Sequence, residues 1–448
     1  MKTTAVRMYG KKDLRLEQFE LPPAKDDEIV AHIISDSICM SSYKAAVQGS
    51  DHKRVPADIA TRPVIIGHEF CGEIVKVGSK WQHKFKSGDR FSIQPALNYR
   101  GSLDAPGYSF HYVGGDATYV NIPDEVMEMD CLLPYEGRAF FMGSLSEPMS
   151  CIVGAFHASY HTTQGRYDHH MGIVEGGTMA ILAGVGPMGI GAIDYAIHNP
   201  RKPGILIVTD IDDARLKRAA SIYTVEEAAR QGVRLVYVNT KRVAEELAAA
   251  GPANAAGPAN AAGAANAAGP AKTVEDHLVE LSGGEGFDDV FVFAPVKPVV
   301  EQGDRILGKD GCLNFFAGPT DPGFSALFNF YNVHYMAHHI VGTSGGNTDD
   351  MREALDLMGR GVINPVAMIT HVGGLNAVRD TTLNLPNIPG GKKLMYTNIE
   401  LPLTAIEDFR EAGKRDPIFA RLAEITEANN GLWCAEAEEY LLANAKKI

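Results

Sequence analysis

The residues best suited to chemistry lie in a glycine-rich stretch, Gly67 to Gly78, in which His68 and Glu69 stand side by side. Its glycines, with Gly72 between the two ends, mark places where backbone passes close to backbone or adopts a positive φ. A neutral imidazole is a common ligand of divalent transition metals, and an adjacent carboxylate can share the metal or support the site. The stretch alone fits a solvent-exposed His-Glu pair in a hairpin equally well, so the rest of the chain must decide.

Two more residues could complete a metal site. Cys39 follows a predicted strand, and Glu147 lies in an apolar-to-neutral stretch just before Pro148. Together with His68 they would form a donor set for catalytic zinc, which takes about three protein ligands from distant loops and leaves one position open. Each has a plainer interpretation: Cys39 as a small buried hydrophobe, and Ser146 or Glu147 as the start of a helix with Pro148 in its first turn.

A second constellation lies in the middle of the chain. The apolar run 178–183 predicts a buried parallel strand, and residues 190–198 are compatible with a helix. Between them stands a G-x-G-x-x-G turn, whose glycines let the backbone approach a pyrophosphate at a helix N-terminus. This turn consists of Gly184, Val185, Gly186, Pro187, Met188 and Gly189. The pattern predicts dinucleotide binding, against the alternative of a tight strand-to-helix turn.

The next strand, 204–210, ends on Asp210, which lies 26 positions after Gly184. An acid near this offset can accept hydrogen bonds from the ribose diol of the cofactor. Asp210 favours NAD, because its carboxylate would repel the 2′-phosphate of NADP; Arg215 nearby keeps NADP as the alternative. Gly342 and Thr343 close the last predicted strand, in a position to meet the cofactor at the carboxyl edge of the sheet.

The elements that position these residues form an α/β chain. Residues 1–150 read as short alternating strands separated by turns, which predicts a compact β-rich domain. In 151–346, strands alternate with helices, the pattern of a doubly wound parallel sheet. We expect 347–448 to return to the first domain, by way of a long irregular excursion around 386–393.

Gly, Pro, Ala and Asn recur in a hexad pattern at 251–272. Such a hexad offers no large apolar face to bury, so we interpret it as a surface insert in a βα connection rather than a folded stack of repeats. We assign it no function.

Composition narrows the class of protein. The 448-residue chain is 45% hydrophobic and 22% charged, as in globular proteins, and its formal net charge of −13 argues against nonspecific nucleic-acid binding. Six dispersed cysteines without a C-x-x-C pair favour a reduced, cytoplasmic protein. No signal peptide or run long enough to span a membrane is visible.

These motifs together resemble the zinc-containing medium-chain dehydrogenases. The resemblance rests on Cys39, the stretch 67–78, Glu147-Pro148 and the turn 184–189, and it covers nearly the whole chain in the family's order. It implies a GroES-like β-rich catalytic domain followed by a Rossmann dinucleotide-binding domain. Glu147-Pro148, in place of a cysteine ligand, is similar to the polyol and sugar dehydrogenase branch.

The resemblance also implies roles for individual residues. Ser41 would exchange a proton with the substrate oxygen, and Lys44 replaces the family's usual histidine on the onward proton route. Glu69 is a catalytic candidate as well, and either Glu69 or Glu147 is the third zinc ligand beside Cys39 and His68. The four cysteines of the family's structural zinc lobe should fall near 95–115. None is there, which implies one catalytic Zn²⁺ per chain and no structural zinc.

The expected reaction is hydride transfer between a nicotinamide cofactor, with NAD preferred and NADP possible, and a ketose phosphate or polyol phosphate. A phosphate would need a cation, for which Lys44, Arg100, Lys392 and Lys393 are the candidates. The alternatives are an unphosphorylated polyol or secondary-alcohol dehydrogenase and a non-catalytic dinucleotide-binding protein. The resemblance suggests a homodimer or homotetramer formed through the Rossmann domain, with no nucleic-acid or membrane partner.

Overall fold

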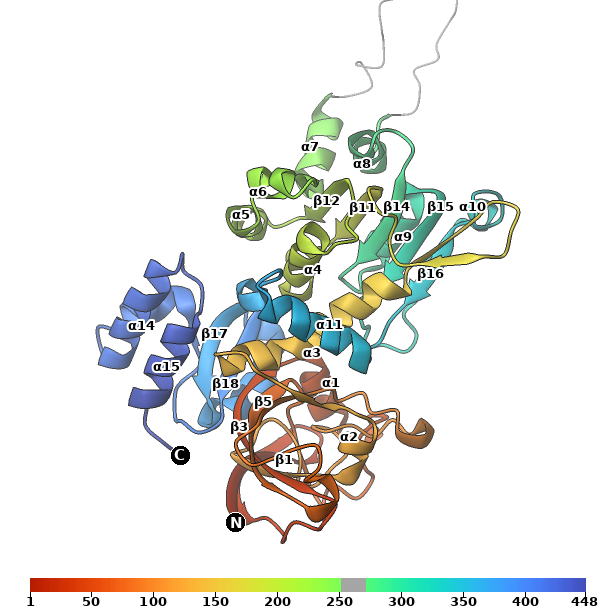
Figure 1. Ribbon diagram of the computed structural model, residues 1–448. Coiled ribbons are helices and arrows are strands. Elements are labelled where there is room, and N and C mark those ends of the chain that lie inside the picture. The colour runs from red at the N-terminus through yellow and green to blue at the C-terminus, as the bar shows by residue number, and fades with distance from the viewer. Residues whose placement is uncertain (251–270) are drawn as a thin grey trace, which may run out of the picture. The chain divides into compact units, whose positions relative to one another are not determined.

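The computed structural model describes residues 1–250 and 271–448, and it divides into two compact units (Figure 1). Unit 1 consists of Met1–Gly154 and Gly345–Ile448, and unit 2 of Ala155–Ser344. The predicted insert 251–272 lies, except for its last two residues, outside the described residues. Among the described helices, none has the length and apolar character needed to cross a membrane.

Unit 1 is built on an eight-stranded sheet with the order β19-β17-β18-β3-β5-β6-β8, in which β7 also pairs with β3; β2, β1 and β4 form a smaller sheet. The strands are β1 (Lys2–Gly10), β2 (Asp13–Glu20), β3 (Ile29–Ile38), β4 (Val64–Ile65), β5 (Phe70–Val77), β6 (Arg90–Ile93), β7 (Tyr119–Ile122), β8 (Leu132–Pro134), β17 (Ile369–Gly374), β18 (Lys392–Tyr396) and β19 (Thr404–Ala405). The centre of the sheet therefore joins strands from both ends of the chain, which Figure 1 shows as red and blue arrows side by side.

The helices of unit 1 are α1 (Met40–Gln48), α2 (Asp124–Glu128), α3 (Phe140–Ala158), α11 (Thr348–Gly359), α12 (Val378–Asn384), α13 (Phe409–Ala412), α14 (Pro417–Ala428) and α15 (Ala435–Asn444). Helix α3 begins at Phe140 and contains Pro148 in its interior. The interpretation that Ser146 or Glu147 starts a helix is therefore wrong. The six residues from Phe140 to Leu145 already form more than one helical turn.

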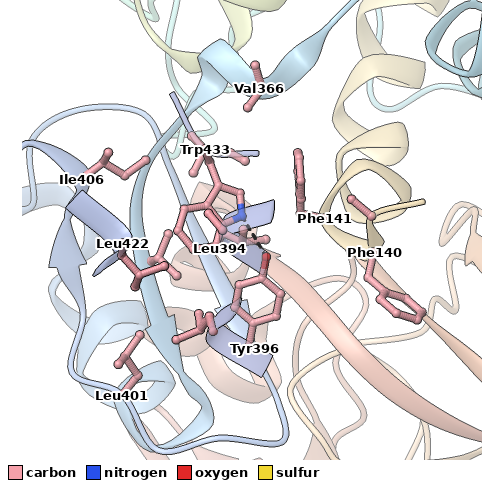
Figure 2. Packing of buried hydrophobic residues seen from close by; sticks show 14 of the residues in the cluster. Phe140, Phe141, Val366, Leu394, Tyr396, Leu401, Ile406, Leu422 and Trp433 are labelled. Atoms are coloured by element: carbon pink, nitrogen blue, oxygen red, sulfur yellow. Dashed lines mark hydrogen bonds between the residues drawn. The ribbon is translucent and has the colours of Figure 1, made fainter. Parts of the chain in front are cut away.

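A buried cluster fixes the start of α3 against the end of the chain (Figure 2). Phe140 and Phe141 donate their backbone N–H groups to the Glu438 carboxylate at 2.7 and 2.9 Å, which satisfies two of the free N–H groups of the first helical turn. The Tyr396 hydroxyl donates to the same carboxylate at 2.8 Å and accepts from the Trp433 indole at 2.9 Å. Residues from α3, β18 and α15 are thus joined in one apolar core.

Unit 2 contains a six-stranded parallel sheet with the order β13-β12-β11-β14-β15-β16. Its strands are β11 (Thr178–Leu182), β12 (Ile205–Asp210), β13 (Arg234–Asn239), β14 (Phe287–Val292), β15 (Leu307–Phe315) and β16 (His339–Gly342), with a separate hairpin of β9 (Tyr160–Thr162) and β10 (His169–Met171). The helices are α4 (Pro187–His198), α5 (Asp213–Ile222), α6 (Val225–Arg230), α7 (Thr240–Ala250), α8 (Val274–Ser282), α9 (Lys297–Ile306) and α10 (Phe330–Tyr335).

The strand order reverses direction at β11, with β12 and β13 on one side and β14 to β16 on the other. Because crossovers between parallel strands are right-handed, this order places the connecting helices on opposite faces of the sheet. The reversal at β11 is also the position at which open α/β sheets bind ligands. The predicted doubly wound fold is confirmed.

Candidate functional site

The metal-site candidates of unit 1 converge because of strand direction. β3 runs antiparallel to both β5 and β18, so the end of β3 lies beside the starts of its two neighbours. Cys39 follows the end of β3, His68 and Glu69 precede β5, and Lys392 begins β18. The sheet therefore brings these four polar side chains together at one end of its central strands.

The sulfur, nitrogen and oxygen ligand atoms of Cys39, His68 and Glu69 lie within 4.8 Å of one another. Cys39 is half-buried, and the other two residues are buried. A thiol, an imidazole and a carboxylate are a donor set that suits zinc, with a fourth position left for a small molecule. The chemistry of this cluster therefore fits the metal that the sequence predicts.

The glycines of the motif allow this approach. Gly67 has φ of 90°, and a Cβ there would lie 2.5 Å from Asp36 Oδ2; a Cβ at Gly72 would lie 2.1 Å from the His32 carbonyl oxygen. Asp36 Oδ1 in turn accepts the backbone N–H of Glu69 at 2.9 Å. The expectation that these glycines mark positive φ or close backbone approach is confirmed.

His68 is held from both ring nitrogens. The Ser42 hydroxyl lies 3.3 Å from Nδ1, and the Tyr108 hydroxyl lies 3.2 Å from Nε2. Burial lowers the pKa of His68. The imidazole is therefore kept neutral, the form that binds a metal.

Glu69 is buried and paired before any metal is considered. Lys392 forms an ion pair with its Oε1, and the Ser37 hydroxyl donates to its Oε2. Burial alone would lower the pKa of the Lys392 ammonium, but the charges of Glu69, Cys39 and Glu147 outweigh it and raise that pKa. Lys392 therefore stays cationic inside the centre.

Glu147 approaches the same centre from α3, although it does not belong to the group of three. The Ser144 hydroxyl contacts Ser35 of β3 at 2.5 Å, and the Ser146 hydroxyl contacts Ser92 of β6 at 2.7 Å. These two contacts fix α3 against the sheet. Burial, with the charge of Glu69 next, raises the pKa of Glu147 to about 7. Glu147 is thus a carboxyl group that a nearby cation would ionise.

Both predicted proton-transfer residues lie in α1, immediately after Cys39. The Cys39 thiol donates to the Ser41 hydroxyl at 3.5 Å, and Ser41 also hydrogen-bonds to Tyr108. Lys44 is half-buried, and its burial lowers the pKa of its ammonium. The structure therefore brings Ser41 to the metal-site candidates.

Tyr108 is a site residue that the sequence did not indicate. Its ring is buried and lies 4.8 Å from the His68 ring, centroid to centroid. It belongs to the segment 95–115, in which the sequence showed only that zinc-lobe cysteines were missing. A lone tyrosine in an irregular segment carries no spacing signal that would have marked it.

The dinucleotide turn of unit 2 has the predicted strand before it and the predicted helix after it. A Cβ at Gly189 would lie 2.1 Å from the Gly184 carbonyl oxygen, so this glycine allows α4 to pack against the turn. A Cβ at Gly186 would meet nothing within 4 Å. Gly186, at the N-cap of α4, therefore has room for a pyrophosphate to approach the helix N-terminus.

The other cofactor candidates lie at the carboxyl edge of the same sheet. Asp210 ends β12, and its Oδ1 accepts the backbone N–H groups of Ile211 and Asp212 at 2.8 and 3.1 Å. Arg215 pairs with Asp212 at 3.6 Å. Thr343 follows β16, and its hydroxyl is buried without a hydrogen-bond partner in the described part of the chain, which suits a polar contact with a bound ligand.

Comparison with known proteins decides the family. The family described as "Alcohol dehydrogenase GroES-like domain" matches residues 25–130, and "Zinc-binding dehydrogenase" matches 187–360. The chain is 49% identical over 446 residues to the L-sorbose 1-phosphate reductase of Klebsiella pneumoniae, covering 100% of this chain and 98% of the other. The chain is a zinc-dependent medium-chain dehydrogenase.

A second relative in this family is the mannitol-1-phosphate 5-dehydrogenase of Aliivibrio fischeri, which is 51% identical over 98% of this chain and 97% of its own. Of solved structures, the 2R,3R-butanediol dehydrogenase of Bacillus subtilis covers 88% of this chain and 100% of its own, with a TM-score of 0.65 and 20% identity, a likeness that shows the fold. The motifs 67–73, 341–346 and 370–375 pointed to L-sorbose 1-phosphate reductase from the sequence, and this resemblance is confirmed.

Membership of this medium-chain dehydrogenase family settles the class of protein. The chain is an NAD(P)-dependent oxidoreductase of the alcohol and polyol dehydrogenase type, with zinc and a nicotinamide cofactor. The alternative of a non-catalytic dinucleotide-binding protein is not supported. The GroES-like and Rossmann fold class is confirmed.

Proposed function

We propose that this dehydrogenase reduces the ketone of a ketose phosphate to the corresponding polyol phosphate, and catalyses the reverse oxidation. The observation that carries the proposal is the cluster of Cys39, His68 and Glu69 with the Ser41 hydroxyl beside it. The names of two relatives at about half identity, a sugar-phosphate reductase and a sugar-phosphate dehydrogenase, support the substrate class. In this proposal unit 1 is the catalytic unit and unit 2 binds the cofactor.

Cys39, His68 and Glu69 would hold the zinc. When bound, the ion would act as a Lewis acid that polarises the substrate carbonyl. A nicotinamide cofactor held by the turn 184–189 would supply the hydride that reduces the carbonyl carbon, and the Ser41 hydroxyl would give its proton to the carbonyl oxygen. The proton is returned to Ser41 from solvent or from Lys44, and Lys392 keeps Glu69 oriented.

Glu69 rather than Glu147 is the third ligand in this proposal, because its carboxylate already lies in the group of three. Glu147 would adjust the charge of the site from its position on α3. We propose one zinc per chain, because the described residues contain one such donor group and the segment 95–115 lacks the cysteines of a structural zinc lobe.

The test uses metal analysis together with oxidation of NADH and NADPH against a panel of ketoses, ketose 1-phosphates and ketose 6-phosphates. We expect turnover of a ketose phosphate with zinc bound, and loss of zinc and turnover together in Cys39→Ser. Activity of a zinc-free Cys39→Ser variant would contradict the mechanism. Preference for free ketoses or secondary alcohols would favour the alternative dehydrogenase.

We propose NAD as the preferred cofactor, since Asp210 ends β12 where the ribose is expected and Arg215 is engaged with Asp212. Asp210→Ala should raise KM for NADH and lower the preference for NADH over NADPH. An unchanged ratio of kcat/KM for the two cofactors would remove Asp210 from this role.

We further propose a homodimer formed through unit 2. β16 is an edge strand whose residues alternate between half-buried and exposed, and exposed apolar side chains lie in and before it: Leu327, Phe330, Tyr331, Tyr335 and Ile340. An exposed edge with such residues is a template for pairing with a second copy. Light scattering after size exclusion should show a dimer for the wild-type protein and a monomer for Phe330→Glu. The cytoplasmic location stays a prediction.

A further inference from the structure

A cation that the sequence did not indicate lies at the metal centre. The Arg54 guanidinium carbon is 5.5 Å from the centroid of the Tyr108 ring. The hydroxyl of the same tyrosine is 3.2 Å from His68 Nε2. One buried aromatic ring therefore contacts both the candidate metal ligand and the guanidinium.

The chain around Arg54 is fixed to this tyrosine. The Ser109 hydroxyl donates to the Arg54 carbonyl oxygen at 2.7 Å, and the backbone N–H of Arg54 donates to His52 Nδ1 at 3.3 Å. The His52 ring stacks on Tyr108 with centroids 5.7 Å apart and an interplanar angle of 11°. Because Nδ1 accepts a hydrogen bond, a neutral His52 carries its proton on Nε2 and can donate from there.

Arg54 has no ion pair with a carboxylate in the part of the chain that the structure describes. Eight residues further on, by contrast, Arg62 pairs with Asp58 at 3.3 Å. A half-buried guanidinium has five N–H donors in a planar fork. Those not facing the tyrosine ring are available to an anion.

The cations expected from the sequence are less suited to this task. Lys392 is paired with Glu69, and Lys393 donates to the carbonyl oxygens of Pro389 and Gly391 at 2.8 and 2.7 Å. The Arg100 guanidinium packs 4.8 Å from the ring of its neighbour Tyr99. Lys44 adds positive charge near His52, but its ammonium lacks the planar set of N–H donors that the Arg54 guanidinium has.

We propose that Arg54, with His52 beside it, binds the phosphate monoester of the substrate; this inference rests on the proposed sugar-phosphate function. A guanidinium binds two phosphate oxygens at once, with a geometry that an ammonium cannot match. Neutral His52 adds one donor from Nε2. Arg54 is then the residue that separates sugar phosphates from free sugars.

The test compares Arg54→Gln with the control Arg62→Gln, which changes an arginine of the same segment that faces solvent. For the zinc-loaded enzyme, we expect Arg54→Gln to lower kcat/KM about 10- to 100-fold for the ketose phosphate. Turnover of the free ketose and zinc content should stay unchanged, and Arg54→Lys should restore part of the loss. Ketose 1-phosphate and 6-phosphate arms show which ester is bound, and a loss confined to either supports the inference. Equal losses on phosphorylated and free ketoses would overturn it.

Calorimetric titration with inorganic phosphate separates this inference from the function on which it rests. If the wild-type enzyme turns over no sugar phosphate but binds phosphate more tightly than Arg54→Gln does, the proposed function fails and the anion site stands. If wild type and Arg54→Gln bind phosphate alike, or wild type binds none, the anion site is refuted.

Discussion

Lys392 and Glu69 form an ion pair from which water is almost wholly excluded, with side-chain exposures of 4% and 1%. Glu69 is also the carboxylate proposed as the third zinc ligand. In the proposed zinc-bound state, two cations, Lys392 and the exchangeable zinc ion, would therefore share a single buried anion. The contribution of Lys392 to the stability of the protein should therefore differ between the metal-free and the zinc-loaded state.

Lys392→Met should destabilise the metal-free protein more than the zinc-loaded protein. Breaking a buried ion pair leaves an uncompensated charge and costs about 3–5 kcal/mol, but bound zinc would supply the missing positive charge. Thermal unfolding of EDTA-treated and zinc-loaded samples measures both losses. Lys393→Met is the matched control, because Lys393 is a buried neighbour in the same strand that donates to the carbonyl oxygens of Pro389 and Gly391 and lies outside the ligand group, so the loss of stability should be the same in both states. Equal losses in Lys392→Met would contradict the shared-anion interpretation.

Glu69→Gln and Glu147→Gln should separate the two carboxylates. The carboxylate of Glu69 lies in the ligand group, so its amide variant should weaken zinc binding at least about 10-fold, whereas Glu147→Gln should retain zinc. Competition with a chromophoric chelator gives both affinities without reference to activity. If Glu147→Gln loses the metal and Glu69→Gln keeps it, the ligand assignment is reversed.

The two glycines of the dinucleotide turn should respond differently to alanine. Gly186→Ala should leave the melting temperature unchanged and weaken NADH binding, because its Cβ meets no protein atom within 4 Å but would occupy space needed by the pyrophosphate. Gly189→Ala should lower the melting temperature, because its Cβ would clash with the Gly184 carbonyl oxygen. Thermal scans and NADH fluorescence titrations measure the two effects. Wild-type NADH affinity in Gly186→Ala would show that the cofactor lies elsewhere.

The metal-free protein should lose stability as the pH rises through the titration of Glu147. Its pKa is raised by burial from 4.5 to about 7 in the folded chain. The folded state therefore binds this proton more tightly than the unfolded state, so the contribution is complete below pH 4.5 and is lost as the pH rises to about 7. The loss amounts to at most about 3 kcal/mol.

Glu147→Gln isolates this contribution, since the amide does not titrate. Urea unfolding of the EDTA-treated proteins at several pH values should give a difference between wild type and variant that changes across this window. Zinc should abolish the difference in slope, because it stabilises the ionised carboxyl group. Parallel pH profiles for the two metal-free proteins would refute the raised pKa.

The sequence was sufficient where the constraint on a residue is local. Gly67 has a positive φ, and Gly72 packs closely against the backbone of His32. Both constraints require glycine, so they can be recognised from the residue type. The strand before Gly184 and the helix after Gly189 follow from apolar runs bounded by glycines. For the same reason the zinc and dinucleotide motifs could be found without a structure.

The sequence was insufficient where a partner is distant. Residues 386–393 predict an irregular excursion, and the two adjacent lysines are candidates for binding a substrate phosphate. Instead, Lys392 and Lys393 begin a buried central strand, because Glu69 and backbone carbonyl oxygens supply partners that only the fold brings close. Tyr108 and Arg54 escaped notice for the same reason. Tyr108 lies 40 positions after His68, and its contacts with His68 and with Arg54 are made only in the fold.

The carboxylate of Glu438 that holds the first turn of α3 also has a consequence for synthesis on the ribosome. Unit 2 is one continuous stretch, Ala155–Ser344, and its parallel sheet can form as soon as that stretch has emerged. The helix that carries Glu147 emerges earlier but must wait for Glu438, and β3 must wait for β18. Unit 2 is thus able to fold during translation, while the surroundings of Cys39, His68 and Glu69 are completed only when the last hundred or so residues arrive.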